Sequence, residues 1–468
     1  LLLNLLVKPA YVLLIETKIQ NAVGPEIFGN YAAILSLTYL FNIFLDVGIT
    51  NFNTRNIAQN QHLLQKHFSA IVTLRTVLSV VYFCVLFIAG SALGYVQEHF
   101  TIFLILGINQ LLASAILYLR SNLSGLLLFK QDAVVSSMDR ALLLISMLVL
   151  LLGESTFGVF QIEWLVWGQF GAYLITFFFA IAMVFRKIGS FQFQLNFPLS
   201  ILIFKRSLPY ALLILLSMAY YKTDSVMLEQ LLDDGSFHAG IYAMGFRFFE
   251  ASNMIGFLFA GLLLPLFSRM FQKKEDVDPL ASTAFQLLFT IGSIAAVFCF
   301  IYAQDILDLF YTEHTAAALQ PFRYLMIAFF FVMLSYLFGT MLTAKGELKW
   351  LNILALFGVV VNIGLNFYLI PDHHAEGSAL ASMITQGLVC LLQIVIVSWR
   401  IKVRISWKTM MAASGFLGML TILSVAFTII QWNWWLEGLL FVSLALVAAV
   451  LTRIVRLKHF LEIFDKAA

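Results

Sequence analysis

Nine charged side chains lie within long apolar stretches of this 468-residue sequence, and they are the residues best placed to do chemistry. An ionisable group inside a bilayer costs at least about 2.5–3.5 kcal/mol, so each needs a partner or a function. Buried cations suit a phosphate group, for which lysine is a compact point charge. Buried carboxylates suit a coupling ion such as Na⁺ or H⁺. The cations are Lys8, Arg75, Arg140, Lys222 and Arg247, and the carboxylates are Asp46, Asp139, Asp224 and Glu250.

Two interpretations of these charges stay open from the sequence. In one, they pair within the protein and only tie helices together, as Arg247 and Glu250 would at a spacing of three residues. In the other, they face a water-filled cavity, where the five cations bind substrate and the four carboxylates couple an ion or pair with the cations. Lys8 and Lys222 lie deepest, whereas Arg75 and Arg140 lie near enough to one surface to extend toward it.

The stretches that hold these charges have the length and composition of membrane spans. The chain is 61% hydrophobic and only 11% charged, whereas a soluble protein carries about 25% charged residues. Apolar runs of about 20 residues recur along it. We therefore predict an all-α multi-pass membrane protein with about fourteen spans, at 1–19, 29–52, 68–92, 100–119, 132–152, 164–185, 208–231, 240–266, 281–304, 322–344, 350–370, 378–399, 410–430 and 436–452.

The distribution of Lys and Arg predicts the orientation of these spans. If the N-terminus is cytoplasmic, about 21 of the 28 basic residues fall on the cytoplasmic side and only Lys18 and Arg323 on the other. The loops on that other side are acidic, for example Asp233 and Asp234. We therefore predict that both termini are cytoplasmic. The chain begins without methionine inside an apolar run, so we also expect a few residues to precede Leu1.

One short pattern occurs twice, about 210 residues apart, which indicates an internal repeat. Gly29, Tyr31 and Ala32 open one span, and Gly240, Tyr242 and Ala243 open another. Aligning "VKPAYVLL" with "YKTDSVML" places Lys8 on Lys222. The copies lie six spans apart, and an even number gives a parallel repeat about the membrane normal. An alternative is chance similarity between apolar segments.

The repeat predicts two pseudo-symmetric six-helix lobes with two additional helices. The predicted divisions are an N-terminal lobe at 1–185, a cytoplasmic interfacial linker at 186–207, a second lobe at 208–399, and two further helices with a basic tail at 400–468. No loop is long enough for a soluble catalytic domain. No cofactor, metal site or nucleic-acid partner is predicted, and no Walker A motif is present in the sequence.

Three stretches carry a family resemblance: "NAVGPEIFGNYAAILSLTYLFNIFLDVGITNFNTRNIAQ", "RSNLSGLLLFKQDAVVSSMDR" and "YYKTDSVMLEQLL" with the following "AGIYAMGFRFFEASN". They resemble the bacterial polysaccharide biosynthesis membrane proteins, the Wzx-type flippases of lipid-linked O-antigen units. These belong to the multidrug/oligosaccharidyl-lipid/polysaccharide exporter superfamily. The resemblance covers the first eight spans well and the others mainly through their hydropathy.

The resemblance implies a MATE-like, two-lobe transporter, not an enzyme, that alternates between inward-open and outward-open states. Its substrate would be an undecaprenyl-diphosphate-linked oligosaccharide, moved from the cytoplasmic to the periplasmic leaflet of a bacterial inner membrane. Its partners would be this lipid-linked substrate, the surrounding membrane lipids and a polysaccharide polymerase, and Na⁺ or H⁺ would be the coupling ion.

Two other functions fit parts of the same sequence. An ion-coupled multidrug antiporter of the same fold would use carboxylates such as Asp46 or Glu250, but the five cations within spans argue against it. A membrane polysaccharide polymerase would be expected to carry a large basic outer loop. The outer loops here are short and acidic.

Overall fold

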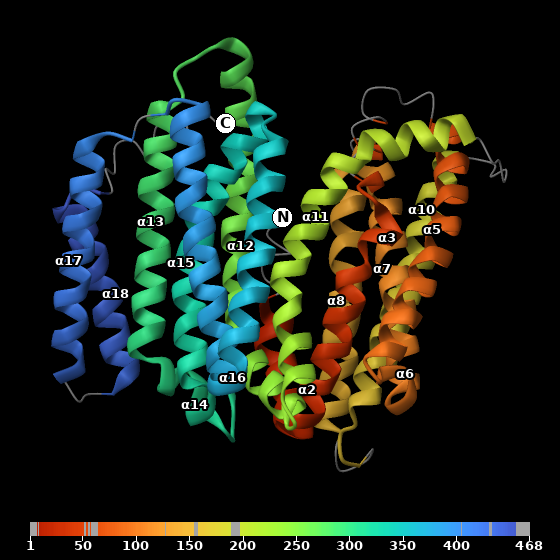
Figure 1. The fold of residues 1–468 in the computed structure, drawn as a ribbon, viewed down its shortest axis with the longest axis horizontal. Coiled ribbons are helices and arrows are strands. Elements are labelled where there is room, and N and C mark those ends of the chain that lie inside the picture. The colour runs from red at the N-terminus through yellow and green to blue at the C-terminus, as the bar shows by residue number, and fades with distance from the viewer. Residues whose placement is uncertain are drawn as a thin grey trace. The chain divides into compact units, whose positions relative to one another are not determined.

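The structure, a computed structural model, describes residues 7, 9–50, 53–54, 57, 64–126, 128–153, 158–188, 197–403, 405–429 and 433–454. The described residues form helices joined by short turns, with no β-strand among them (Figure 1). In chain order the helices are η1 Tyr11–Glu16, α2 Thr17–Phe41, α3 Ile43–Asp46, α5 Leu64–Ala92, α6 Tyr95–Glu98, α7 Phe100–Gly125, α8 Phe129–Leu152, α10 Ile162–Ile188, α11 Phe197–Leu231, α12 Gly235–Lys273, α13 Asp278–Ile301, α14 Ala303–Phe310, α15 Thr315–Lys345, α16 Leu348–Arg400, α17 Trp407–Ile429 and α18 Trp434–Leu451.

The helices confirm the predicted all-α membrane fold. Within the described residues, 11 helical segments are long and apolar enough to cross a bilayer. Two of them each contain two predicted spans. One is Tyr11–Asp46, which bends at Gly24, and the other is α16, which bends at His374. Helix α11 covers the predicted span at 208–231. In the part of the chain that the structure describes, each of the fourteen predicted spans thus falls on a helix.

The two bends lie where the sequence has turn residues. Gly24 has φ 83°, a backbone conformation that glycine adopts without steric cost, and Pro25 follows it. In α16, Pro371 precedes the break at His374, where φ is 52°. Each bend reverses the chain between two spans without a long loop.

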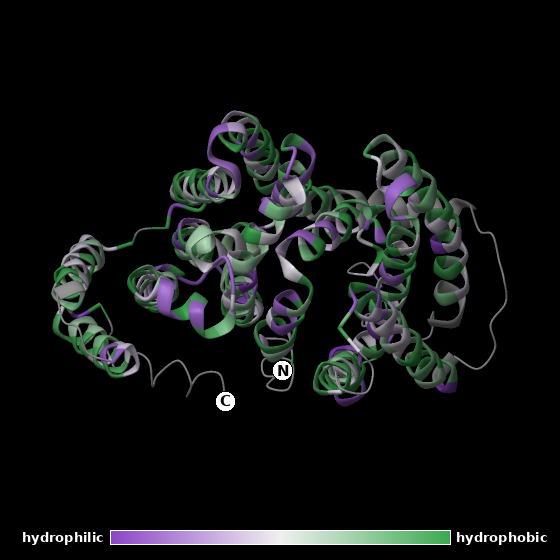
Figure 2. Ribbon diagram, turned by 90° about the horizontal axis from the view of Figure 1, so that it is seen from below, coloured by the Kyte–Doolittle hydropathy of each residue, from purple (hydrophilic) through white to green (hydrophobic). Residues whose placement is uncertain are grey.

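The contacts divide the chain into two compact units, Leu1–Ala243 and Met244–Ala468. In unit 1, α7 packs against α10, and α11 packs against α2. In unit 2, α15 packs against α13 and α16, and α17 and α18 pack against α13 and each other. Most helices of each unit are seen nearly end-on in Figure 2.

This contact-based division does not coincide with the predicted linker at 186–207. Residues 186–188 belong to α10, and α11 already begins at Phe197. Because α11 packs on α2, it joins the first unit together with the start of α12. Residues 189–196 of the predicted linker lie outside the described residues. The four predicted divisions remain a prediction about lobes.

The repeated Gly-x-Tyr-Ala segments pack against each other within unit 1. A Cβ atom added to Gly240 would lie 1.9 Å from the Pro25 carbonyl oxygen, and one added to Gly29 would lie 1.7 Å from the Ser236 carbonyl oxygen. The side chain of Gln20 also donates to the Gly240 carbonyl at 2.9 Å. Only glycine permits such a close approach of two backbones.

The tyrosines of both segments are buried anchors. Gln169 donates to the Tyr31 hydroxyl at 2.7 Å, and the Tyr242 hydroxyl donates to Asp224 at 2.7 Å. A buried hydroxyl without a partner is costly, so each bond fixes the position of its segment. The repeated pattern therefore has a physical function, which is to join the start of α12 to α2.

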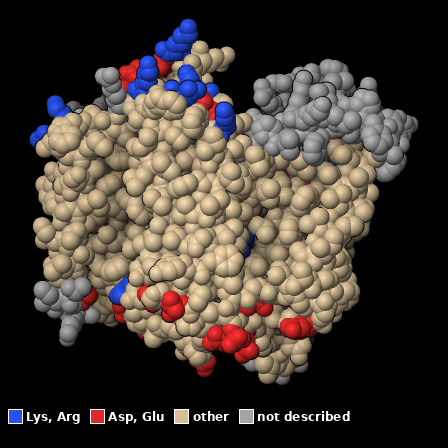
Figure 3. All heavy atoms as spheres, in the orientation of Figure 1, with Lys and Arg blue, Asp and Glu red and all other residues tan. Residues whose placement is uncertain are grey.

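Charges of opposite sign lie at opposite helix ends in unit 2. Basic residues gather at one end, around the end of α12, the α15–α16 turn and the end of α16 (Figure 3). Acidic residues occupy the other end, including Asp305 and Asp308 on α14 and Asp372 and Glu376 at the bend of α16. This pattern is what the positive-inside rule leads us to expect of one cytoplasmic and one external surface.

The orientation is tested by cysteine labelling. In a variant whose three native cysteines are replaced by serine, we expect Lys273→Cys to react only with membrane-permeant maleimides. Asp234→Cys, between α11 and α12, should react with impermeant ones. Labelling of intact cells checks this, and the reverse pattern would overturn the predicted topology.

Candidate functional site: a cation–tyrosine cluster in unit 1

Arg140 is held near the middle of α8 by aromatic neighbours. It is the twelfth residue of this 24-residue helix, and its guanidinium lies 5.4 Å from the centre of the Tyr11 ring. Tyr39 and Tyr173 also lie within its electrostatic reach, and the Asp139 carboxylate is 3.8 Å away. About 24% of the Arg140 side chain is exposed, so a ligand has access to it. The cation is therefore positioned but not enclosed.

Lys222 approaches the same group of rings from α11. Its ammonium lies 5.3 Å from the centre of the Tyr39 ring, and Lys222 and Tyr39 are both half-buried. A cation over an aromatic face gains about 0.5–2 kcal/mol, depending on its hydration. Tyr39 thus interacts with both cations, although α8 and α11 are far apart in sequence. We define the cation–tyrosine cluster as Tyr11, Tyr39, Arg140, Tyr173 and Lys222.

Glu16 adds a carboxylate that the sequence analysis missed. This residue ends η1 and lies near Tyr11, Tyr31 and Tyr173. Its position inside the predicted first span was a signal that should have placed it among the intramembrane anions. Asp139, by contrast, lies beside Arg140 and offsets its charge, which lowers the cost of keeping this cation within the membrane.

Arg75 and Asp46 form a separate internal network. An Arg75 nitrogen lies 2.5 Å from Asp46, and the guanidinium also donates to the Ser114 carbonyl at 2.8 Å. The Tyr118 ring lies 5.1 Å from the guanidinium, and the Thr50 amide donates to Asp46 at 3.2 Å. These contacts join α5 to α3 and α7. For this pair, the structure agrees with the interpretation in which charges tie helices together.

This network gives a stability prediction. Replacing Arg75 with alanine removes the guanidinium donor from the Asp46 carboxylate and from the Ser114 groups, which should lower the free energy of unfolding by about 1–3 kcal/mol. The double variant Arg75→Ala/Asp46→Ala should recover part of that loss, because no unpaired charge remains. Thermal unfolding of the purified protein measures both, with exposed Arg269→Ala as the control. An Arg75→Ala protein as stable as the control would contradict this role.

The remaining predicted residues lie in other settings. Asp224 is buried and accepts from Tyr242, which links α11 to α12 within unit 1. In unit 2, Arg247 is buried and donates to the Tyr311 hydroxyl at 2.9 Å, whereas Glu250, one turn later on α12, is exposed. Lys8 lies outside the described residues, so its predicted equivalence with Lys222 stays a prediction.

The cluster has the chemistry of a site for a phosphorylated, hydroxyl-rich ligand. Lys222 and Arg140 supply the two cations, and arginine binds phosphate oxygens with a planar set of donors. The tyrosine rings offer faces for stacking, and their hydroxyl groups are hydrogen-bond donors and acceptors. The described residues contain no group of three or more His, Cys, Asp or Glu arranged to hold a metal ion.

Comparison with known proteins places the chain in a family. Residues 10–271 match the sequence profile of the family described as "Polysaccharide biosynthesis protein". The chain belongs to this family. Residues 209–368 also match the MatE family, which overlaps the first match in α11 and α12. The resemblance noted in the sequence is confirmed at the level of the superfamily.

Individual relatives agree with this assignment. An uncharacterized membrane protein of Methanocaldococcus jannaschii is 26% identical over 388 residues, which cover 79% of this chain and 89% of the relative. The structure resembles the lipid II flippase MurJ in an inward closed conformation, with a TM-score of 0.71 at 15% identity, covering 95% of this chain and 96% of MurJ. It also resembles an inward-facing MATE-family multidrug transporter of the MOP superfamily, with a TM-score of 0.68 at 12% identity, covering 84% of this chain and 94% of that one. This member of the polysaccharide biosynthesis family therefore has a MATE-like, multi-pass membrane fold.

Proposed function

We propose that the protein is a flippase that moves an undecaprenyl-diphosphate-linked oligosaccharide from the cytoplasmic to the periplasmic leaflet by alternating access. The observation that carries the proposal is the half-buried cation–tyrosine cluster in a chain of the polysaccharide biosynthesis family. The MurJ-like fold supports it, because that neighbour is described as a lipid II flippase.

In this proposal the diphosphate binds between Lys222 and Arg140. Two cations on different helices match two linked phosphates, and charge-assisted bonds of this kind contribute about 1.5–3 kcal/mol each. When the site is empty, Asp139 offsets the charge of Arg140. An anionic ligand competes with this carboxylate for Arg140 and also contacts Lys222, so its binding favours the state in which α8 and α11 are close together.

In the proposed complex, the tyrosines contact the sugar that is attached to the diphosphate. Tyr39 lies near both cations and is half-buried, so its ring is accessible for stacking on a sugar face. Tyr11 and Tyr173 are buried and lie near Arg140. Such a site discriminates by charge and shape more than by the identity of any one sugar.

The experiment that tests this proposal is a measurement in cells. In a strain that lacks the gene, lipid-linked oligosaccharide should accumulate in the cytoplasmic leaflet, and expression of this chain should restore its export. The proposal also places the protein in the bacterial inner membrane with both termini cytoplasmic and Na⁺ or H⁺ as coupling ion. Accumulation of the same lipid in the periplasmic leaflet would overturn the proposed direction of transport.

A second candidate function is an ion-coupled multidrug antiporter of the same fold. The match of residues 209–368 to the MatE family favours it, as do the carboxylates Glu16 and Asp139 beside the cluster. This function predicts drug resistance that disappears in Asp139→Asn and survives in Lys222→Ala. The flippase function predicts the opposite sensitivity, namely dependence on the cations.

A further inference from the structure

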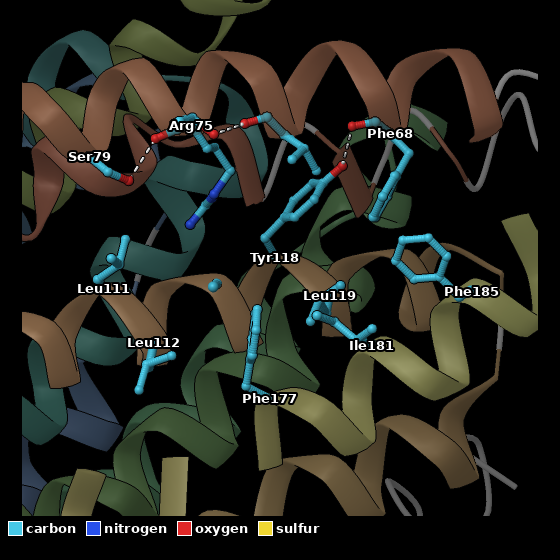
Figure 4. Close-up of a pocket in the computed structure, with 13 residues that line it drawn as sticks. Phe68, Arg75, Ser79, Leu111, Leu112, Tyr118, Leu119, Phe177, Ile181 and Phe185 are labelled. Atoms are coloured by element: carbon cyan, nitrogen blue, oxygen red, sulfur yellow. Dashed lines mark hydrogen bonds between the residues drawn. The ribbon is translucent and has the colours of Figure 1, made fainter. Parts of the chain in front are cut away.

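Unit 1 also contains a hydrophobic cavity, whose lining includes none of the five residues of the cation–tyrosine cluster. It has a volume of about 450 Å³ and is lined by α5, α7 and α10. Figure 4 shows Phe68, Arg75 and Ser79 from α5 and Tyr118 and Leu119 from α7 facing Phe177, Ile181 and Phe185 from α10. A second hollow of about 470 Å³ shares Thr76 and Ser79 with it and continues along α5 to Phe87. Together they are called the α5 groove.

The polar groups that line the α5 groove are satisfied within the protein. The Ser79 hydroxyl donates to the Arg75 carbonyl at 2.7 Å, and the Thr76 hydroxyl donates to the Val72 carbonyl at 3.0 Å. The Tyr118 hydroxyl donates to the Phe68 carbonyl at 3.4 Å, and dashed lines mark these bonds in Figure 4. A cavity whose polar groups have partners holds no strong site for water and suits an apolar ligand.

The groove is also electrically neutral. Among the described residues that line the two hollows, Arg75 is the one charged residue, and its guanidinium is paired with Asp46. A phosphate would have to displace that carboxylate and enter an otherwise apolar space. The charge of the groove therefore matches a hydrocarbon chain and not the head of a lipid.

The length of the groove distinguishes between hydrocarbon chains. Phe68 and Phe87 are nineteen residues apart on α5, which is about 28 Å at about 1.5 Å per residue. The hydrocarbon core of a bilayer is about 30 Å thick, so a phospholipid acyl chain reaches only about half that distance. A chain that fills the groove has to pass the middle of the membrane. Long isoprenoid chains have this reach.

The groove is open to the surrounding lipid. Val80 lines its second hollow and is 62% exposed, and Val77, on the adjacent face of α5, is 52% exposed. A chain therefore enters sideways from the bilayer without passing the cation–tyrosine cluster. Helix α5 keeps one face for the protein core and one for this groove.

We propose that the α5 groove binds part of the isoprenoid chain of a polyprenyl-linked lipid. This inference rests on the proposed function for its choice of lipid, and it gives that lipid a second contact, separate from the site for the diphosphate. One part of the isoprenoid chain lies in the groove along α5, and the remainder of that chain lies in the bilayer. Binding there keeps the carrier at unit 1 while its polar head moves.

Photolabelling of the purified protein in lipid nanodiscs tests the proposal. The probe is a polyprenyl monophosphate with a diazirine in its chain and no sugar, compared with a phospholipid that carries a diazirine in an acyl chain. Peptide mapping should find the polyprenyl label on groove residues such as Phe83, Leu112 and Phe177. The phospholipid label should be found on the exposed Val77 face. Equal labelling of the groove by both probes would identify an ordinary lipid-filled surface and overturn the proposal.

Matched variants make the test specific. Ser79→Phe fills the junction of the two hollows and should reduce polyprenyl labelling by about tenfold or more, because several buried CH₂ contacts are lost. Val77→Phe, two residues away on the lipid face, should leave it unchanged. Ala115→Phe and exposed Leu117→Phe form a second pair on α7, useful if Ser79→Phe does not fold. Unchanged labelling in both filling variants would contradict the proposal.

Because the probe carries no sugar, labelling does not depend on transport. Labelled groove residues in a protein that fails to export oligosaccharide would support the groove and contradict the proposed function. Normal export by a protein whose groove is never labelled would support the proposed function and contradict the proposed lipid-binding groove.

Discussion

Replacing Lys222 with alanine is expected to reduce oligosaccharide export by about tenfold to a hundredfold, while the protein still inserts into the membrane. The reason is the loss of one charge-assisted contact to the diphosphate, which contributes about 1.5–3 kcal/mol. Arg140→Ala should have an effect of similar size, because its guanidinium shares Tyr39 with Lys222. Export by a complemented null strain, at matched protein abundance, measures both.

The accompanying variants separate charge from packing. Lys222→Arg keeps a cation and should restore part of the export, and Tyr39→Phe keeps the ring and should retain most of it. Lys273→Ala, at the exposed end of α12, is the control and should behave as wild type. The repeat alignment places Lys8 on Lys222, so Lys8→Ala belongs in the same series. If Lys222→Ala and Arg140→Ala both export normally, the cluster is a structural feature and not a substrate site.

Replacing Gly240 with alanine is expected to disrupt the contact between α12 and α2. The new methyl group would lie 1.9 Å from the Pro25 carbonyl oxygen, and backbone atoms on both sides cannot move away without shifting a helix. Overpacking of this kind costs about 1–3 kcal/mol. We expect a lower unfolding temperature and an export rate reduced by about tenfold.

The same helix contains a matched control for this variant. Gly261 also lies on α12, and a Cβ atom there would meet nothing within 4 Å. Gly261→Ala should therefore retain wild-type stability and export, while Gly29→Ala should resemble Gly240→Ala because its Cβ would lie 1.7 Å from the Ser236 carbonyl oxygen. If Gly240→Ala and Gly261→Ala have the same stability and the same export rate, the close contact at Gly240 is not needed for either.

The helices were predictable because a membrane span is determined by the residues within the span itself. Length and hydropathy alone define a span, and the bends at Gly24 and His374 coincide with Gly-Pro and Pro-Asp-His-His sequences. Boundaries differ mainly where a helix extends beyond the apolar run, as α11 does by starting at Phe197.

The site was only partly predictable because the rotation of each helix about its axis depends on packing. Nothing in the sequence indicates that Arg75 pairs with Asp46, or that Tyr11, Tyr39 and Tyr173 lie near Arg140. It identified Arg140 and Lys222 as costly intramembrane cations but not their common neighbour Tyr39. The repeat could be recognised in the sequence, whereas the direct contact of Gly29 with the start of α12 is seen only in the three-dimensional structure.

The most direct test of the account is flipping by the purified protein in vesicles. A fluorescent polyprenyl-diphosphate oligosaccharide is incorporated into both leaflets, and an impermeant quencher reports the fraction that reaches the outer leaflet. We predict that vesicles with the wild-type protein expose the inner pool to the quencher, while vesicles with Lys222→Ala protein behave as protein-free vesicles do. Wild-type vesicles that protect the inner pool as well as protein-free vesicles, under an imposed Na⁺ or H⁺ gradient of either direction, would contradict the proposed function.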